Sequence, residues 1–198
     1  MVLSERQMIG LFTALVALLI TQRVLELLLA EKNRRWSLAH GGVESGQQHY
    51  PVIVGMHVLY YGSLIFERHY FSRAWNPAWP LWLGILILAQ VLRIWVIVTL
   101  GRLWNTRIIV IPGRSLVRSG PYRFVRHPNY VVVAVELAAV ALLCGAYLTA
   151  LCFTVANALV LRVRIREEEL ALKQLADAHH VQLPRFVPVS VRDKRPQD

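Results

Sequence analysis

Long apolar blocks constrain this chain more than any other feature of its sequence. They cover residues 8–30, 51–71, 79–100, 128–145 and 146–163. A helix needs about 20 mostly apolar residues to cross a bilayer. Only 17% of the 198 residues are charged, which is low for a soluble domain of this length. The sequence therefore predicts an all-α integral membrane protein with about five transmembrane helices.

The joints between these blocks indicate a single unit. The last two blocks meet at residues 144–147, where Cys-Gly-Ala-Tyr predicts a tight turn at the far membrane face. The first block lacks a small-residue cleavage site and contains Gln22, Arg23 and Glu26, so we expect a retained span and not a signal peptide. No repeat or linker divides the chain, and we expect residues 1–198 to form one domain.

Two other features of the sequence argue against particular kinds of site. Cys144 and Cys152 have neither metal-ligand spacing nor the number needed for a disulfide framework, so we expect two buried apolar thiols and no bound metal. The stretch GGVESG, residues 41–46, carries two adjacent glycines and a third nearby. It is not a dinucleotide-binding loop, because no strand precedes it and the glycine spacing is wrong.

Basic residues predict the orientation of the chain. The segment 101–129 contains no acidic residue and six arginines: Arg102, Arg107, Arg114, Arg118, Arg123 and Arg126. With five spans, the first loop and the tail lie on the same side as this segment. Cytoplasmic loops carry an excess of lysine and arginine, so we expect the N-terminus outside and the C-terminus in the cytoplasm. The net charge of +10 then suits anionic lipid head groups, and we expect no nucleic-acid partner.

Polar residues inside the apolar blocks indicate a functional interior. Charged side chains are costly there and usually mark a site or a buried pair. Counted from the cytoplasmic side, all of them fall in the inner half of the membrane and none in the outer half: Arg23, Glu26, His57, Arg93, Glu136 and Asn157. We predict an ion pair between Arg93 and Glu136 and a water-accessible pocket that opens inward. The alternative is that these residues only fix helix packing.

The segment between the third and fourth blocks is long for a structureless loop, and long loops are usually functional. Its stretch RIIVIPG, residues 107–113, predicts an extended strand or hairpin. Pro128 suits the first position of a helix. The free amides of that helix start, beside Arg126 and His127, could hold an anion or a polar ligand head. The alternative is a structural helix entry whose basic residues contact lipid phosphates.

Three motifs in the second half of the chain resemble one family. GPYRFVRHPNY (120–130), with Glu136 six residues further on, resembles the isoprenylcysteine carboxyl methyltransferase family of membrane methyltransferases. RIREEELAL (164–172) resembles the Arg-x-x-x-Glu-Glu-x-x-Leu segment of that family, and LPRFVP (183–188) resembles its C-terminal end. The resemblance covers about half the chain, from residue 101 onward.

The resemblance implies S-adenosylmethionine as cofactor, bound at the cytoplasmic membrane surface under a C-terminal amphipathic helix. Residues 1–100 would supply three spans, and 101–198 the cofactor segment, the helical hairpin and that helix. Arg164 would face the substrate, and Glu168, four residues later on the same helix face, would contact the cofactor; we expect this pair to be catalytic. Carried over by motif, the other cofactor-binding residues would be Arg114, Ser115, Leu116, Val117, Tyr122, His127, Pro128, Asn129 and Tyr130.

Two departures from the prenylcysteine enzymes change the expected substrate. After the glutamates this chain reads LADAHHVQ where those enzymes carry an aromatic-glycine-x-x-tyrosine pattern. Its N-terminal half reads QRVLELLLAEKNRRWSLAHGGVESGQQHYPVIVGMH over residues 22–57. That stretch resembles a bacterial branch of the family found with type III polyketide synthases, whose members O-methylate alkylpyrones or alkylresorcinols. That resemblance implies a lipid-like hydroxyl acceptor in the bacterial inner membrane. A basic group near the ring would favour the oxyanion, and the candidate substrate-binding residues are His57, Arg93, Glu136 and Arg164.

Three alternatives stay open. The chain could methylate the carboxylate of a prenylated cysteine, since Arg164 could serve either acceptor. It could be a membrane reductase that uses a nicotinamide cofactor, or a lipid-binding protein without catalysis. The ligand that stabilises the protein separates these classes. S-adenosylhomocysteine should stabilise either kind of methyltransferase, a nicotinamide nucleotide should stabilise a reductase, and neither should stabilise a lipid-binding protein.

Overall fold

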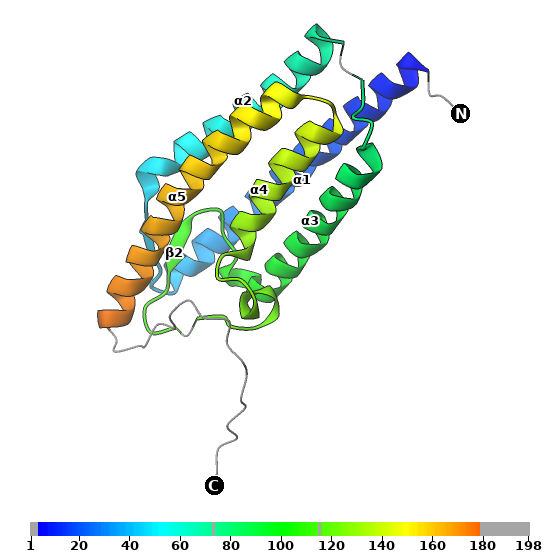
Figure 1. Ribbon diagram of the computed structural model, residues 1–198. Coiled ribbons are helices and arrows are strands. Elements are labelled where there is room, and N and C mark those ends of the chain that lie inside the picture. The colour runs from blue at the N-terminus through cyan, green and yellow to red at the C-terminus, as the bar shows by residue number, and fades with distance from the viewer. Residues whose placement is uncertain (1–3, 73, 115, 179–198) are drawn as a thin grey trace.

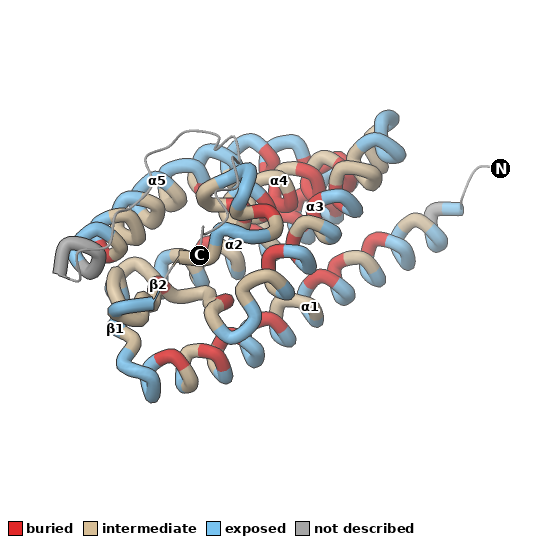
Figure 2. Tube along the Cα trace, turned by 90° about the horizontal axis from the view of Figure 1, so that it is seen from below, coloured by how far each residue is buried: buried red, intermediate tan, exposed pale blue. Residues whose placement is uncertain are grey.

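The computed structural model describes residues 4–72, 74–114 and 116–178, except the side chains of 5 and 175–178. That part of the chain folds into α1 (Glu5–Ala39), α2 (Tyr50–Tyr70), α3 (Trp79–Leu100), α4 (Pro128–Leu143) and α5 (Tyr147–Ala178). Helices α2, α5, α4 and α3 lie side by side in that order, and α1 runs behind them (Figure 1). Buried residues gather along α4, whereas much of α1 is exposed (Figure 2).

The helices confirm an all-α membrane protein. In the described chain three helices are long and apolar enough to cross a bilayer: Arg6–Ala39, Trp79–Leu103 and Tyr147–Gln174. Helix α4 is apolar but only 16 residues long. It lies between α3 and α5, where valines and alanines pack closely, and its length is limited by Pro128 at one end and the turn after Leu143 at the other. Five spans remain a prediction.

Two helices extend beyond the predicted apolar blocks. Helix α1 starts at a capping box formed by Ser4 and Gln7 and continues to Ala39, so Arg23 and Glu26 lie near its middle and not in its last turns. Helix α5 continues without a break through residues 164–172. That stretch is therefore the end of α5. A separate C-terminal helix stays a prediction, and the LPRFVP motif lies outside the described residues.

The predicted turn between α4 and α5 is confirmed. Gly145 has a φ of 72°, a conformation that glycine adopts without steric cost. The amide of Ala146 donates to the Ala141 carbonyl over 2.9 Å, which closes the end of α4. Cys144 is buried here as expected, but Cys152 is exposed on the outer side of α5. The prediction of two buried thiols is wrong for Cys152, because a lipid-facing position accepts a small apolar side chain equally well.

A short antiparallel ribbon joins two loops at the opposite end of the bundle. Strand β1 (Val43–Ser45) pairs with β2 (Ile108–Val110), with Glu44 opposite Ile109. The RIIVIPG stretch is thus extended as predicted, but its partner comes from the first loop. We call this the ribbon end, and the end that holds the α4–α5 turn the turn end. The ribbon fixes the α1–α2 loop against the segment that precedes α4.

The turn end contains two buried charged residues. The Glu67 carboxylate accepts hydrogen bonds from the backbone amides of Leu148 (3.0 Å) and Thr149 (2.7 Å), and Arg68 donates to the Cys144 carbonyl over 3.2 Å. The prediction that buried polar residues are confined to the other half of the membrane is therefore wrong. The reason is that the first amides and last carbonyls of a helix lack partners within it, and two side chains of α2 supply those partners to α5 and α4.

Candidate active site

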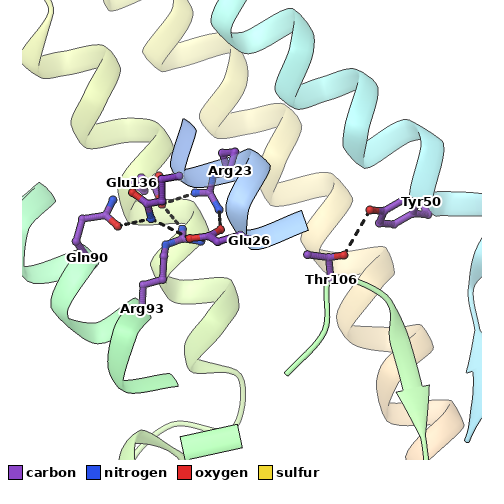
Figure 3. Close-up of polar contacts among 8 residues, drawn as sticks. Arg23, Glu26, Tyr50, Gln90, Arg93, Thr106 and Glu136 are labelled. Carbon is purple, nitrogen blue, oxygen red and sulfur yellow. Dashed lines mark hydrogen bonds and ion pairs between the residues drawn. The ribbon is translucent and has the colours of Figure 1, made fainter. Parts of the chain in front are cut away.

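The predicted ion pair between Arg93 and Glu136 is present, and it belongs to a larger cluster from α1, α3 and α4 (Figure 3). One arginine nitrogen of Arg93 contacts Glu136 and another contacts Glu26 over 2.9 Å. Arg23 binds the same two carboxylates over 2.5 Å and 2.6 Å. We call these four residues the ionic cluster. Two positive and two negative side chains make it electrically neutral.

Three residues of the ionic cluster are buried, Arg23 is half-buried, and most of the polar atoms of the cluster are paired. Arg93 is 2% exposed and Glu136 3% exposed. Gln22 extends the cluster by donating to Glu26 and to Gln90, both over 2.8 Å. Two buried nitrogens on neighbouring turns of α3, Arg93 Nε and Gln90 Nε2, have no hydrogen-bond partner within the described residues. Since Arg93 and Glu136 bind one another, the cluster first of all holds three helices together. The two unpaired nitrogens are buried donors without a partner in the described part of the chain.

His57, the other predicted substrate residue of the interior, lies on α2 and is half-buried. Its Nδ1 is 2.8 Å from the Ile53 carbonyl oxygen. A carbonyl oxygen only accepts, so in the neutral ring Nδ1 carries the proton and Nε2 keeps a free lone pair. The structure places His57 on a different helix from the ionic cluster residues, and its role in substrate binding remains a prediction.

A second polar group forms at the ribbon end, where the start of α4 meets the last turns of α5. Tyr130 donates a short hydrogen bond to Glu168. His127 stacks on the Tyr130 ring with 5.5 Å between ring centroids, and its Nε2 lies 3.4 Å from Glu169 Oε1. Arg126 reaches the same glutamate over 3.2 Å. Helix α4 begins at Pro128 as predicted, and the two motifs of the sequence meet here.

Arg164 joins this group from one turn earlier on α5. Its guanidinium carbon lies 5.8 Å from the centroid of the Tyr130 ring. It also donates a short hydrogen bond to the Thr106 carbonyl, in the segment before β2. Arg164 and Glu168 therefore both contact Tyr130. This is the shared helix face that their spacing predicts.

The remaining predicted cofactor residues fall in different surroundings. Tyr122 is half-buried, and burial together with the nearby Glu168 carboxylate raises its pKa well above the ordinary value, so it stays a neutral hydrogen-bonding group. Asn129 has a buried Oδ1 without a hydrogen-bond partner in the described chain. Arg114 instead lies over the Trp36 ring at the end of α1, at 5.4 Å. Leu116 and Val117 are half-buried, and Ser115 lies outside the described residues.

Comparison with known proteins agrees with the motifs. The model of the isoprenylcysteine carboxyl methyltransferase (ICMT) family matches residues 82–174, which contain α4, β2 and the contacts around Tyr130. An uncharacterized protein of Bacillus subtilis, YpbQ, is 41% identical over 167 residues, covering 83% of this chain and 98% of its own length. The chain belongs to the ICMT family. An uncharacterized Haemophilus influenzae protein is 30% identical over 160 residues, 80% of this chain and 93% of its own. No solved structure matches.

ICMT family members are membrane methyltransferases that use S-adenosylmethionine, so the family suggests an enzyme of this class. The polar groups at the ribbon end fit that cofactor chemically. Its sulfonium and ammonium groups are cations, and Glu168, Glu169 and the unpaired Asn129 Oδ1 are acceptors. Its carboxylate is an anion, and Arg126 is a neighbouring donor. These residues would hold the cofactor of an ICMT family enzyme.

Several residues of this site could not be found from the ICMT family motifs. Thr106 contributes a backbone oxygen, which has no signal in the sequence. Glu44 of β1 pairs with Arg107, and the hydroxyl of Tyr50, at the start of α2, lies 3.4 Å from that of Thr106; the pairing of β1 with β2 holds this part of the chain beside the site. The β-branched residues of β2 predict a strand but not its partner. Glu169 lies within the quoted motif, and its contacts with Arg126 and His127 depend on how α4 and α5 are rotated.

Proposed function

We propose that this chain is an S-adenosylmethionine-dependent O-methyltransferase that acts at the cytoplasmic face of the membrane. The acceptor is a lipophilic molecule with a ring hydroxyl, such as an alkylpyrone or an alkylresorcinol. The observation that carries the proposal is the contact of Tyr130 with both Glu168 and Arg164, which unites the two family motifs in one site. The bound cofactor supplies an electrophilic methyl group.

The cofactor side of the site is formed by α4, the segment before it and the end of α5. The Glu168 and Glu169 carboxylates would balance the positive charge of the cofactor. The Oδ1 of Asn129 is a hydrogen-bond acceptor without a partner in the described chain. The segment from Arg114 to Val117, with Tyr122, His127 and Pro128, completes the predicted binding set. Methyl transfer is an in-line displacement, so most of the catalysis comes from holding the two reactants in the right geometry.

The acceptor side is marked by Arg164. Its guanidinium is anchored to the Thr106 carbonyl and the Tyr130 ring, which leaves other nitrogens to bind an oxygen of the acceptor. A positive charge beside a ring hydroxyl favours the oxyanion, the better nucleophile. His57, Arg93 and Glu136 lie deeper in the bundle and would contact an acceptor from that side. The alkyl tail would stay in the bilayer.

The proposed orientation puts the ribbon end in the cytoplasm and the N-terminus outside, in the inner membrane of a bacterium. The arginine-rich segment 101–129 then lies at the lipid head groups, where anionic lipids attract basic side chains. Exposed apolar side chains on α1, α3 and α5 would contact lipid tails.

A carboxyl methyltransferase for a prenylated cysteine is the second candidate. Arg164 favours it to the same extent, because a guanidinium binds a carboxylate through two parallel hydrogen bonds. The departures in the sequence after the glutamates favour the hydroxyl acceptor.

Ligand binding to the purified protein tests the class first. We expect S-adenosylhomocysteine to raise the unfolding temperature in detergent, and NADPH to leave it unchanged. Transfer of labelled methyl from S-adenosylmethionine then tests the acceptor, with a pentadecyl resorcinol, an alkylpyrone and farnesylated N-acetylcysteine compared in parallel. Stabilisation by NADPH, or by neither ligand, would contradict a methyltransferase. Labelling of the farnesylated cysteine alone would select the second candidate.

A further inference from the structure

The first loop, which the family motifs do not include, is folded against the end of α5. Gly46, next to strand β1, has a φ of 64°. A Cβ built there would lie 3.8 Å from the Cβ of Glu167 and 3.8 Å from Nδ1 of His49. Glu167 is three residues after Arg164, on the same side of α5. Gly46 thus faces this side of α5, and His49 lies next to Gly46.

A continuous chain of contacts links Arg164 to this loop. Arg164 donates to the backbone oxygen of Thr106, and the Thr106 hydroxyl lies 3.4 Å from the hydroxyl of Tyr50 (Figure 3). The Arg107 guanidinium carbon is 4.2 Å from the centre of the Tyr50 ring. Glu44 holds Arg107 in place through an ion pair of 2.7 Å. The Tyr50 ring is therefore fixed, with its hydroxyl directed toward the segment that anchors Arg164.

Two buried nitrogens in the same region lack a hydrogen-bond partner within the described residues. They are Nδ1 of His49 and Nδ2 of Asn105, the neighbour of Thr106. Buried polar atoms are nearly always paired in folded proteins. Both atoms belong to residues next to the contact chain, and neither uses its hydrogen-bonding capacity within the described part of the protein.

We propose that His49 and Tyr50 bind the reacting hydroxyl of the acceptor and, with Arg164, determine which acceptor is used. The inference rests on the proposed function and extends the acceptor site from α5 to the first loop. A neutral imidazole and a phenol can each donate or accept a hydrogen bond, which suits a ring hydroxyl and a neighbouring ring oxygen. A carboxylate acceptor only accepts hydrogen bonds, and Arg164 can donate these without help from His49 or Tyr50.

The position of the two residues also suits a lipid-like acceptor. Tyr50 is the first residue of α2, and the following turns of that helix expose apolar side chains along its length: Val52, Val54, Val58 and Leu59. A ring held at His49 and Tyr50 would leave its alkyl tail beside this surface, within the bilayer.

Steady-state kinetics with pentadecyl resorcinol as the acceptor test the inference. We expect Tyr50→Phe and His49→Ala each to raise the KM for the resorcinol by roughly 3- to 10-fold, as for the loss of one hydrogen bond. The dissociation constant of S-adenosylhomocysteine should stay within about twofold of wild type, because neither residue lies on the cofactor side. His49→Asn, whose amide can occupy the position of Nδ1, should restore most of the affinity. Gln48→Ala, an exposed neighbour, is the matched control.

The possible failures are distinguishable. Unchanged KM values in both variants, or equal losses in acceptor and cofactor affinity, would overturn the inference while the methyltransferase activity stands. Absence of S-adenosylhomocysteine binding by the wild-type protein would overturn the proposed function itself. If His49→Ala does not fold, His49→Asn and Tyr50→Phe still decide the question, since Tyr50→Phe keeps the ring under Arg107.

Discussion

Tyr130 holds the two halves of the candidate site together at the level of single residues. Its hydroxyl donates to Glu168, its ring lies near the Arg164 guanidinium, and His127 stacks against the ring. The motif in the sequence suggests that His127 and Tyr130 contact the cofactor. The structure adds that Tyr130 also orients the two α5 residues, so its hydroxyl and its ring have separable effects.

Removing only the hydroxyl of Tyr130 should weaken cofactor binding. In Tyr130→Phe, Glu168 loses a donor and its orientation, and we expect the affinity for S-adenosylhomocysteine to fall by about 0.5–1.5 kcal/mol. Calorimetry on the detergent-solubilised protein measures this directly. Tyr70→Phe, an exposed tyrosine at the turn end, should bind like wild type. If Tyr130→Phe and Tyr70→Phe bind S-adenosylhomocysteine with equal affinity, the Tyr130 hydroxyl does not contribute to cofactor binding.

Substitution of Glu168 should affect the affinity for the cofactor, and substitution of Arg164 the affinity for the acceptor. Glu168→Gln removes a negative charge near a cationic ligand, so it should raise the cofactor dissociation constant and leave acceptor affinity nearly unchanged. Arg164→Lys keeps the charge but loses the planar fork, so it should mainly weaken the acceptor. Because both residues contact Tyr130, a double-mutant cycle on turnover should show a coupling of about 0.5 kcal/mol or more. If Glu168→Gln and Arg164→Lys both keep wild-type affinities for cofactor and acceptor, and their effects on turnover simply add, both roles are contradicted.

At the scale of helices, the apolar blocks predict the elements well but not where they end. The starts of α3 and α4 agree with the sequence because Pro80 and Pro128 lie in their first turns. The full lengths of α1 and α5 are not apparent from hydropathy, because the polar residues at the end of a long helix have the same hydropathy as those of a loop. The pairing of Arg93 with Glu136 follows from depth, whereas the participation of Arg23 and Glu26 depends on how α1 is rotated.

Glu67 acts at this scale because it belongs to α2 but caps α5. Glu67→Gln keeps the shape but removes the charge that faces two backbone amides and the Thr149 hydroxyl. We expect a loss of about 1–3 kcal/mol in unfolding free energy, seen as a lower melting temperature in detergent. Affinity for S-adenosylhomocysteine should not change, because the cap lies at the turn end. Glu31→Gln, an exposed ion pair on α1, should have a much smaller effect.

For the whole molecule, the sequence predicts the membrane class and the meeting of two distant motifs. It predicts the extended stretch of β2 but neither β1 nor their pairing, since a three-residue strand has too few residues to show an alternating pattern and the partner of β2 lies in another loop. The contact of Arg114 with Trp36 could not be predicted either, because it depends on the extension of α1 beyond the apolar block.

Orientation in the membrane is a property of the whole chain that labelling can test. In a Cys152→Ala background, a cysteine at Ser119 should be protected from an impermeant maleimide in intact cells, because the ribbon end is cytoplasmic in the proposed topology. A cysteine at Ala74, exposed at the turn end, should be labelled. The reverse pattern would place the candidate site outside the cell and remove its access to the cofactor.

The ionic cluster also has a consequence for how the protein is made. Helices enter the membrane in chain order, and α1 arrives with Arg23 and Glu26 already paired on one helix. When α3 follows, Arg93 adds a cation without a matching anion, which is costly in lipid. Only α4, with Glu136, restores neutrality. A chain stopped between α3 and α4 would carry this unmatched cation, and we expect it to insert less well than a chain that includes α4.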